Sequence, residues 1–450
     1  MNLKPYPIPF KDITGQEYKD SGIEWLGEVP EGWEVKRLKW VVQCLDSKRI
    51  PLNSEERGLM QGEYPYYGAN GVLDYVDKYL FDSEIVLLGE DGAPFNDPLK
   101  DVAFYVNHRC WVNNHAHVLR PLSSTNAKYL TYILNCIDYS TVITGSTRDK
   151  LNQSEMENIF LSFPPLNEQL QIATFLDQKT AKIDELIKKS ERLIELLKEK
   201  RQASISHAVT KGLAPNAKMK DSGIEWIGEI PEGWEVKRLK HLAGNDISAV
   251  QTGPFGAQLH ASDYIDEGVP LILIRNVNNL WIDDSNIPKI SEEKATSLSM
   301  YRLQEGDIIF SRVGSIGRIA LVTKREEGWL ISGQMLRIRI SNPKLNNHFL
   351  LYVADSNLVS EFIEFKSVGS TRDSINTDIL RNVCIPLPSL LEQKAIIQYI
   401  ETTTANIDSL IQKILSQIAV LKEYRQALIS NVVTGKVRVY DCNLQGKRIK

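Results

Sequence analysis

The sequence predicts an α+β protein in which two mixed α/β domains are joined by two long helices that pair as an intramolecular antiparallel coiled coil. Two observations lead to this fold class. The chain of 450 residues contains an internal duplication, and each copy ends in a long amphipathic stretch. A chain of this length can form two or three domains with separate cores. The duplication further predicts that the two halves are related by a pseudo-twofold axis.

The duplication is clearest in the segments that open each half. Residues 19–40 return as residues 220–241, and the pentapeptide GSTRD recurs at 145–149 and 369–373. The offset between the copies therefore grows from 201 to 224 residues along the chain. The first repeated segment differs at three positions, Leu26/Ile227, Val29/Ile230 and Trp40/His241.

The segments between these repeats, roughly 42–144 and 242–368, have diverged strongly. Both nevertheless contain a strand that runs into a glycine-rich turn, then a strand with polar residues at its start, then a helix. We interpret this as a common frame that carries two different binding domains, in preference to duplication followed by uniform drift.

The helical stretches follow the middle segments at about 167–210 and 391–434. Apolar residues recur in both at the i, i+3, i+4, i+7 spacing of an amphipathic helix. Ser389 and Glu392 have the spacing of a capping box at the second start. At about 1.5 Å per residue, each helix would be about 65 Å long. We expect the two stripes to pair with each other; the alternatives are packing on the helix's own domain or on another protein.

These features predict the following organisation: an N-terminal arm at 1–18, a first entry segment at 19–41, a first middle domain at 42–166, a central long helix at 167–212, a linker with a second entry segment at 213–241, a second middle domain at 242–390, a C-terminal long helix at 391–435 and a basic tail at 436–450.

Polar side chains at loops and strand ends of the middle domains are candidates for contacts with DNA. Arginine suits guanine, asparagine or glutamine suits adenine, and flexible loops can reach phosphates. For each such residue, a satisfied loop or strand-end side chain is the alternative, and helix capping or an ion pair is equally open for the two arginines of GSTRD. The candidates are Tyr66, Tyr67, Asn70, Asn113, Asn114, His115, Arg148, Gln251, Arg275, Asn276, Arg312, Ser315, Gln334 and Arg372.

Several function classes lack support in the sequence. The net charge of −4 is not that of a protein that coats DNA by charge alone. There is no phosphate loop, no GxGxxG fingerprint and no Asn-Pro-Pro-aromatic tetrapeptide of an amino-methyltransferase. His115 and His117 could begin a metal site, but no third ligand is implied. The five cysteines form no CxxC pair, and no apolar run reaches membrane-spanning length. We expect no catalytic residue, no metal and a cytoplasmic location.

The ordered set of motifs resembles the DNA-specificity subunits of type I restriction–modification systems. It comprises the repeated DSGIEW and PEGWEVKRL, the YPYYGANG loop, GDIIFSRVGSIGR, and GSTR followed by proline and an EQ-led helix. The resemblance covers nearly the whole chain, twice over. It implies two target-recognition domains that each read one half of an asymmetric bipartite DNA site, with the helices setting the spacer.

The resemblance also implies partners and excludes a cofactor in this chain. Two methyltransferase subunits would dock on the helices and use S-adenosylmethionine, and restriction subunits would use ATP and Mg²⁺; no membrane is involved. Two other hypotheses stay open from the residues alone. One is a tandem scaffold that binds proteins, and the other is a self-contained endonuclease or methyltransferase.

Overall fold

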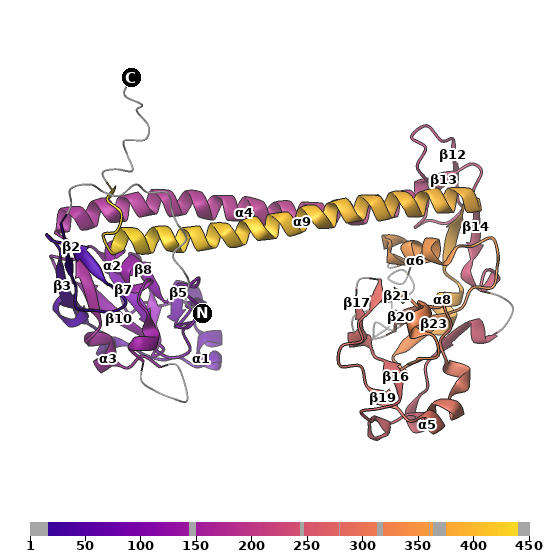
Figure 1. Ribbon diagram of the computed structural model, residues 1–450, viewed down its shortest axis with the longest axis horizontal. Helices are drawn as coiled ribbons and strands as arrows, with labels where there is room; N and C mark the ends of the chain where they lie inside the picture. The colour runs from indigo at the N-terminus through magenta and orange to yellow at the C-terminus, as the bar shows by residue number, and fades with distance from the viewer. Residues whose placement is uncertain are drawn as a thin grey trace. The chain divides into compact units, whose positions relative to one another are not determined.

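The computed structural model describes residues 17–143, 150–243, 247–278, 280–312, 318–359, 361–362 and 375–439. The chain forms two compact units, and each is described here by itself. Unit 1 comprises residues 1–191 and 414–450, and unit 2 comprises residues 192–413. Figure 1 shows the elements of both units. No helix in the described ranges combines the length and apolarity needed to cross a membrane.

Unit 1 is built from eleven described strands, three short helices and parts of both long helices. The strands are β1 (Tyr18–Asp20), β2 (Glu28–Pro30), β3 (Glu34–Arg37), β4 (Val42–Cys44), β5 (Gln61–Gly68), β6 (Gly71–Val76), β7 (Ile85–Gly89), β8 (Ala103–Val106), β9 (Trp111–Val112), β10 (Ala116–Pro121) and β11 (Phe160–Phe163). The helices are α1 (Ser54–Leu59), α2 (Ala127–Leu134), α3 (Gln153–Glu157) and the start of α4 (Leu166–Lys211).

Unit 2 repeats most of this order, with additional short strands and with its first short helix placed later among them. Its strands are β12 (Met219–Asp221), β13 (Glu229–Pro231), β14 (Glu235–Arg238), β15 (Val250–Thr252), β16 (Val269–Ile272), β17 (Val277–Asn278), β18 (Trp281–Ile282), β19 (Lys289–Ile290), β20 (Ile308–Ser311), β21 (Ile319–Leu321), β22 (Leu330–Ile331), β23 (Met335–Ile338) and β24 (Cys384–Leu387). Its helices are α5 (Glu292–Ser297), α6 (Asn347–Asp355), α8 (Thr377–Arg381) and the start of α9 (Leu390–Val433).

The two units have equivalent sheets. An antiparallel four-stranded sheet has the order β4-β10-β7-β8 in unit 1 and β15-β23-β20-β21 in unit 2. A three-stranded sheet, β6-β5-β9 or β19-β16-β22, combines one antiparallel and one parallel pair in both units. The strands are short and mostly buried, which explains why their sequences are apolar runs and not clean alternations. The divergent middle segments therefore share one fold.

The repeated entry segments belong to the frame that holds each domain on its helix. β3 pairs with β11, and β14 pairs with β24, and each of these partner strands leads into a long helix. The indole N–H of Trp33 donates to Glu168 Oε2 at 3.0 Å in the first turn of α4. Trp234 makes the same bond to Glu392 Oε1 at 3.2 Å. The near identity of the entry segments is thus explained by identical contacts with the two helix starts.

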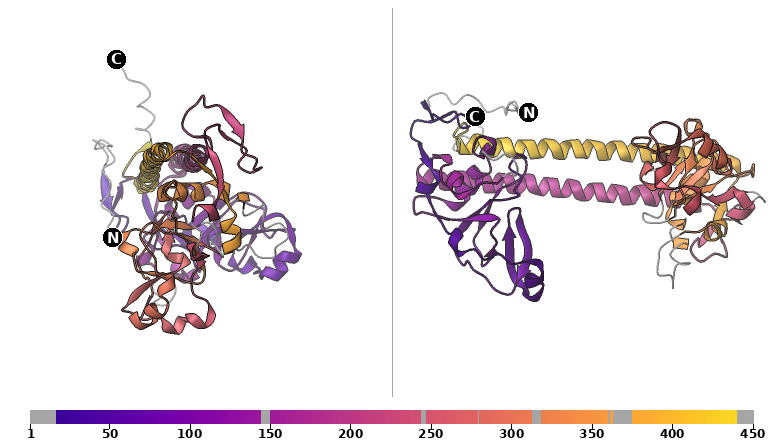
Figure 2. Two further views of the ribbon diagram at one scale, coloured as in Figure 1. Left: turned by 90° about the vertical axis from the view of Figure 1, so that its right-hand side faces the viewer. Right: turned by 90° about the horizontal axis from the view of Figure 1, so that it is seen from below.

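The long helices run antiparallel within each unit. In unit 1 the start of α4 packs against the end of α9, and Arg425 Nε lies 3.0 Å from Asp184 Oδ1. In unit 2 the end of α4 packs against the start of α9, and Arg201 Nε lies 3.5 Å from Asp408 Oδ1. Figure 2 shows the two helices side by side over each domain. The predicted fold class is confirmed.

The long helices also contribute side chains to the hydrophobic cores of the domains. Ile172, Leu176 and Ile183 of α4 share a core with α2 and with the end of α9. Ile396 and Ile400 of α9 join the core of unit 2 in the same way. Each apolar stripe is therefore divided between the facing helix and the adjacent domain, so the expected pairing of the two helices occurs together with the alternative of packing on the helix's own domain.

Candidate nucleic-acid interface

The polar ends of the central strands occupy equivalent positions in the two units. Glu90 directly follows β7, and its backbone N–H donates to the carbonyl of His115 at 2.8 Å. Arg312 directly follows β20, and its backbone N–H donates to the carbonyl of Gln334 at 3.0 Å. Strand pairing in the two sheets has the same register up to this point. One scaffold position thus carries Glu90 beside His115 in unit 1 and Arg312 beside Gln334 in unit 2.

The next backbone bond extends this equivalence to the segment after GSTRD. The N–H of Leu151 donates to the carbonyl of Glu90 at 2.8 Å, and the N–H of Ile375 donates to the carbonyl of Arg312 at 2.9 Å. Leu151 and Ile375 are separated by the same 224 residues as the two GSTRD copies. The strand end, the polar turn beside it and this later segment therefore meet in both units.

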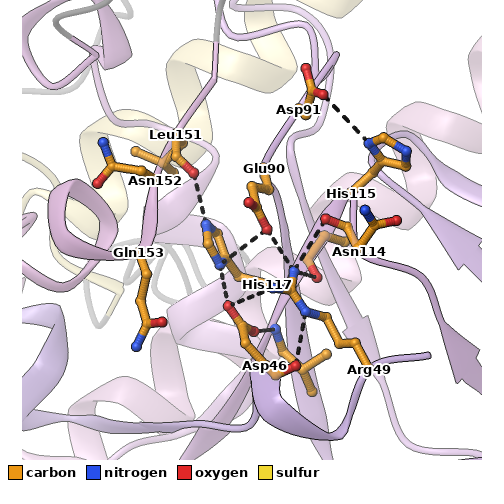
Figure 3. A network of polar contacts seen from close by, with 12 residues as sticks. Asp46, Arg49, Glu90, Asp91, Asn114, His115, His117, Leu151, Asn152 and Gln153 are labelled. Atoms are coloured by element: carbon orange, nitrogen blue, oxygen red, sulfur yellow. Dashed lines mark hydrogen bonds and ion pairs between the residues drawn. The ribbon is translucent and has the colours of Figure 1, made fainter. Parts of the chain in front are cut away.

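In unit 1 a network of charged side chains lies beneath the strand end (Figure 3). Arg49 is its centre: Nη1 lies 2.6 Å from Glu90 Oε2, and Nη2 lies 3.3 Å from Asp46 Oδ2. His117 is buried between Asp46, at 2.5 Å from Nδ1, and the Leu151 carbonyl, at 2.9 Å from Nε2. All of these groups are largely shielded from solvent. Their burial is tolerated because each charged group has an opposite charge or a hydrogen-bond partner within reach.

The electrostatics of this network favour the ionised form of Asp46. Burial by itself raises the pKa of Asp46, but the hydrogen bond and charge of His117, the N–H of Val118 and the charge of Arg49 outweigh it, so the pKa lies below its ordinary value. Asp46, Glu90 and His117 are close enough to share a cation. Arg49 supplies a positive charge between the two carboxylates, so the group forms an ion-pair network.

The network fixes the backbone of the turn that presents polar side chains. Arg49 Nη1 donates to the Ala116 carbonyl at 2.8 Å. The side chains of Asn114 and His115, just before this point, are exposed. His115 Nδ1 lies 3.7 Å from Asp91 Oδ2, and the His115 side chain is 47% exposed. A turn that is held in this way and carries exposed polar side chains is suited to reading a polar surface such as a base edge.

Unit 2 builds the equivalent position differently. The guanidinium of Arg312 lies over the ring of Phe255, with 5.1 Å between Cζ and the ring centroid. Gln334 is exposed beside it, and Arg275 is exposed in the turn after β16. The Gln251 side chain already takes part in a hydrogen bond, because its Oε1 accepts from Arg337 Nη2 at 2.9 Å.

Four candidate residues lie in the core and have other roles. Tyr66 is buried in β5 and its hydroxyl accepts from the N–H of Leu52 at 2.9 Å, and Tyr67 packs in the core with its hydroxyl 3.2 Å from His108 Nε2. The segment read as a loop at 62–71 is mostly strand, which explains their burial.

The other two buried candidates are asparagines that hold turns. The Asn113 Oδ1 accepts from the N–H of His115 at 2.8 Å. The Asn276 side chain accepts from the N–H of Leu273 at 3.1 Å and donates to the Asp283 carbonyl at 3.1 Å. The sequence correctly placed polar groups at these turns, but the structure turns their amides inward.

The remaining candidates divide into exposed residues and residues outside the described ranges. Asn70 is exposed, and its Nδ2 donates to the Gly92 carbonyl at 3.2 Å. Arg148, Ser315 and Arg372 lie outside the described residues. The sequence reading missed Glu90, Arg49 and Phe255. Only the shared position after the central strand could have indicated Glu90, and no pattern singled out the other two.

Two stretches of the chain, residues 30–196 and 231–420, match the family model described as the type I restriction modification DNA specificity domain. The chain belongs to this family. A specificity subunit from Methanocaldococcus jannaschii, of the type I restriction enzyme MjaVIII, is 25% identical over 443 residues that cover 96% of this chain and 99% of the relative. A putative specificity subunit from Haemophilus influenzae, S.HindORF215P, is 26% identical over 416 residues, covering 90% and 98%.

A solved structure supports the fold of this specificity subunit. It comes from work on complex assembly and conformational transition of the type I R-M system, and it matches with a TM-score of 0.63 at 16% identity, covering 91% of this chain and 99% of that one. The predicted family, the fold and the role as a non-catalytic DNA-specificity subunit are therefore confirmed.

Proposed function

We propose that each unit of this specificity subunit reads one half of an asymmetric bipartite DNA site. The observation that carries the proposal is the equivalence of Glu90–His115 with Arg312–Gln334, where one backbone scaffold presents different polar groups. Different side chains on the same backbone read different bases, because each base pair offers its own donors and acceptors in the major groove. A protein-binding scaffold has no comparable need for two non-identical polar turns in one frame.

The proposed contacts come from residues near these strand ends that are exposed or, in the case of Arg312, partly exposed. In unit 1 they are Asn70, Asn114 and His115, and in unit 2 they are Arg275, Arg312 and Gln334. Gln251 contributes indirectly, through its hydrogen bond with Arg337. Arg148, Ser315 and Arg372 remain proposals from the sequence alone. Tyr66, Tyr67, Asn113 and Asn276 support the turns from the core.

We further propose that the long helices dock two copies of one methyltransferase subunit, one on each unit. Exposed apolar side chains recur along both helices at the 224-residue offset of the duplication. Single exposed apolar residues are ordinary, but a duplicated set indicates a duplicated partner. The pairs are Leu166/Leu390, Leu186/Leu410 and Leu196/Val420.

The cofactors of the complex then belong to the partners. S-adenosylmethionine would be bound by the methyltransferase subunits, and ATP and Mg²⁺ by the restriction subunits. We propose that the complex acts in the cytoplasm, where its DNA is. The long helices would set the spacer between the half-sites.

Exchange of one domain tests the proposal. Residues 42–144 are replaced with the corresponding segment of another specificity subunit, and the methylated sequence is determined in cells that also express the methyltransferase subunit. We expect one half of the motif to change and the other half to persist. Simultaneous change of both halves would contradict independent reading. An assembled complex that methylates no bipartite motif would favour the protein-scaffold alternative.

A further inference from the structure

We propose that Arg312 reads a guanine in the half-site of unit 2, whereas Glu90, at the same scaffold position in unit 1, does not contact bases and instead holds the reading turn. This inference rests on the proposed function and deepens it, because it names one residue and one base. It predicts that the two halves of the site are read by unequal means at one shared backbone position.

The pairing register places a second residue beside each of these two. Cys44 pairs with Leu119 in unit 1, and Val250 pairs with Ile338 at the matching point of the unit 2 sheet. Arg49 and Phe255 each lie five residues beyond these strand positions. Arg49 contacts Glu90, and Phe255 contacts Arg312. An ion pair in unit 1 is thus replaced by a cation–π contact in unit 2.

This replacement changes what the strand-end side chain can do. The Glu90 carboxylate is 2.6 Å from Arg49 and 3.4 Å from Lys150, and its side chain is only 13% exposed. Its charge is therefore neutralised, and its oxygens are occupied. A free carboxylate here would instead repel the DNA phosphates.

Arg312 has the opposite properties. Among the described residues no carboxylate forms an ion pair with it, and its guanidinium stacks on Phe255, which is 47% exposed. An aromatic ring orients a guanidinium without using its N–H donors. Other arginines of the same domain have anionic or carbonyl partners: Arg302 with Glu292, Arg325 with Glu326, Arg339 with Asp307, Arg318 with the Val277 carbonyl and Arg337 with the Ser248 carbonyl.

The chemistry of the guanidinium selects the base. Its parallel N–H groups match the O6 and N7 acceptors of guanine in the major groove, which no other base offers together. The neighbouring Gln334 is exposed and joined to Arg312 by a backbone hydrogen bond, so an adjacent base contact is available from the same rigid point.

The test uses the full chain with its methyltransferase partner and compares Arg312→Gln and Arg312→Lys with the wild type. The matched control is Arg302→Gln, which makes the same charge change at an ion pair of the same domain. Methylated motifs are determined from the DNA of expressing cells. We expect Arg312→Gln to lose the preference for one guanine in one half-site, by a factor of roughly 5 to 150, the discrimination of one bidentate contact, and Arg312→Lys to keep part of that preference, because an ammonium can also donate to guanine. The control keeps the wild-type motif.

Each other result has a definite meaning. An unchanged motif, or a fall in methylation that is equal for all sequences, would overturn the assignment and indicate no contact or a phosphate contact. If a variant methylates nothing, the purified complex is titrated with duplexes that carry each base at each half-site position. Relaxed preference at one guanine then supports the assignment, and its absence overturns it. A wild-type bipartite motif with no guanine in one half defeats this inference alone, whereas a wild type with no bipartite motif defeats the proposed function.

Discussion

The buried side chain of Gln169 accepts a hydrogen bond from the backbone N–H of Asn126 at 2.8 Å, which ties the first turn of α4 to the cap of α2. The Gln169 amide also donates to the Pro164 carbonyl at 2.8 Å. In unit 2, Gln393 accepts from the N–H of Asn346 at 2.8 Å and donates to the Pro388 carbonyl at 2.9 Å. The EQ pair at each helix start is therefore a structural joint.

Gln169→Ala should destabilise unit 1 without changing the DNA sequence that is read. The substitution leaves a buried N–H and carbonyl groups without partners, at a cost of about 2 kcal/mol or more. Thermal unfolding followed by calorimetry measures the loss, and the methylated motif checks specificity. Gln393→Ala is the matched variant for unit 2. A changed half-site with unchanged stability would contradict the structural role.

Asp46→Asn should lower the stability of unit 1 near neutral pH and reduce its dependence on acid. Because the folded-state pKa of Asp46 lies below its ordinary value, the ionised carboxylate stabilises the fold above about pH 4. That contribution is lost as the pH falls through the lowered folded-state pKa. Removal of a buried charge from this network should cost about 2 to 3 kcal/mol at pH 7. Denaturant unfolding between pH 3 and pH 7 measures both effects, and equal pH profiles for both proteins would count against the network.

Leu186→Glu should remove one of two bound methyltransferase subunits, and the double variant with Leu410→Glu should remove both. These side chains are 52% and 44% exposed, so the substitutions should leave the fold intact. Lys189→Glu, at a side chain that is 70% exposed on the same helix, is the control for added negative charge. Native mass spectrometry of the purified complex counts the subunits. Full occupancy in the double variant would exclude this docking surface.

The isolated chain should bind DNA weakly and with little sequence preference. Because its net charge is −4, the chain alone releases few counterions from the DNA phosphates, so partner subunits must supply most of the binding free energy that comes from counterion release. We expect dissociation constants in the non-specific range, roughly 1 to 100 µM at physiological salt. Fluorescence anisotropy with matched and scrambled duplexes, with and without the methyltransferase subunit, measures this. Tight and specific binding by the chain alone would refute the prediction.

The frame could be predicted from the sequence because its signals are local and duplicated. An apolar stripe at helical spacing and a repeated entry segment can be recognised without knowledge of tertiary contacts. The same reasoning failed for Tyr66 and Tyr67, since the segment 62–71 is interpreted as a loop from the sequence, whereas residues 61–68 form the central strand of a three-stranded sheet. Burial there follows from pairing with distant strands, which the segment itself does not encode.

The equivalence of Glu90 and Arg312 could be recognised only with the structure. Glu90 and Arg312 share neither residue type nor a constant offset with the flanking repeats, because the middle segments differ in length. The sequence matches the two strand-and-turn segments, and the backbone hydrogen bonds to His115 and Gln334 establish that Glu90 and Arg312 occupy the same position in them. The roles of Arg49 and Phe255 depend on that equivalence, so neither could be recognised from the chain alone.

The most direct test of bipartite reading is single-molecule methylome sequencing of cells that express this chain with its methyltransferase subunit. The result we predict is one asymmetric motif with two specified halves, a fixed unspecified spacer and methyladenine in both halves. An assembled complex that yields a continuous motif, or no new methylated motif, would contradict the account.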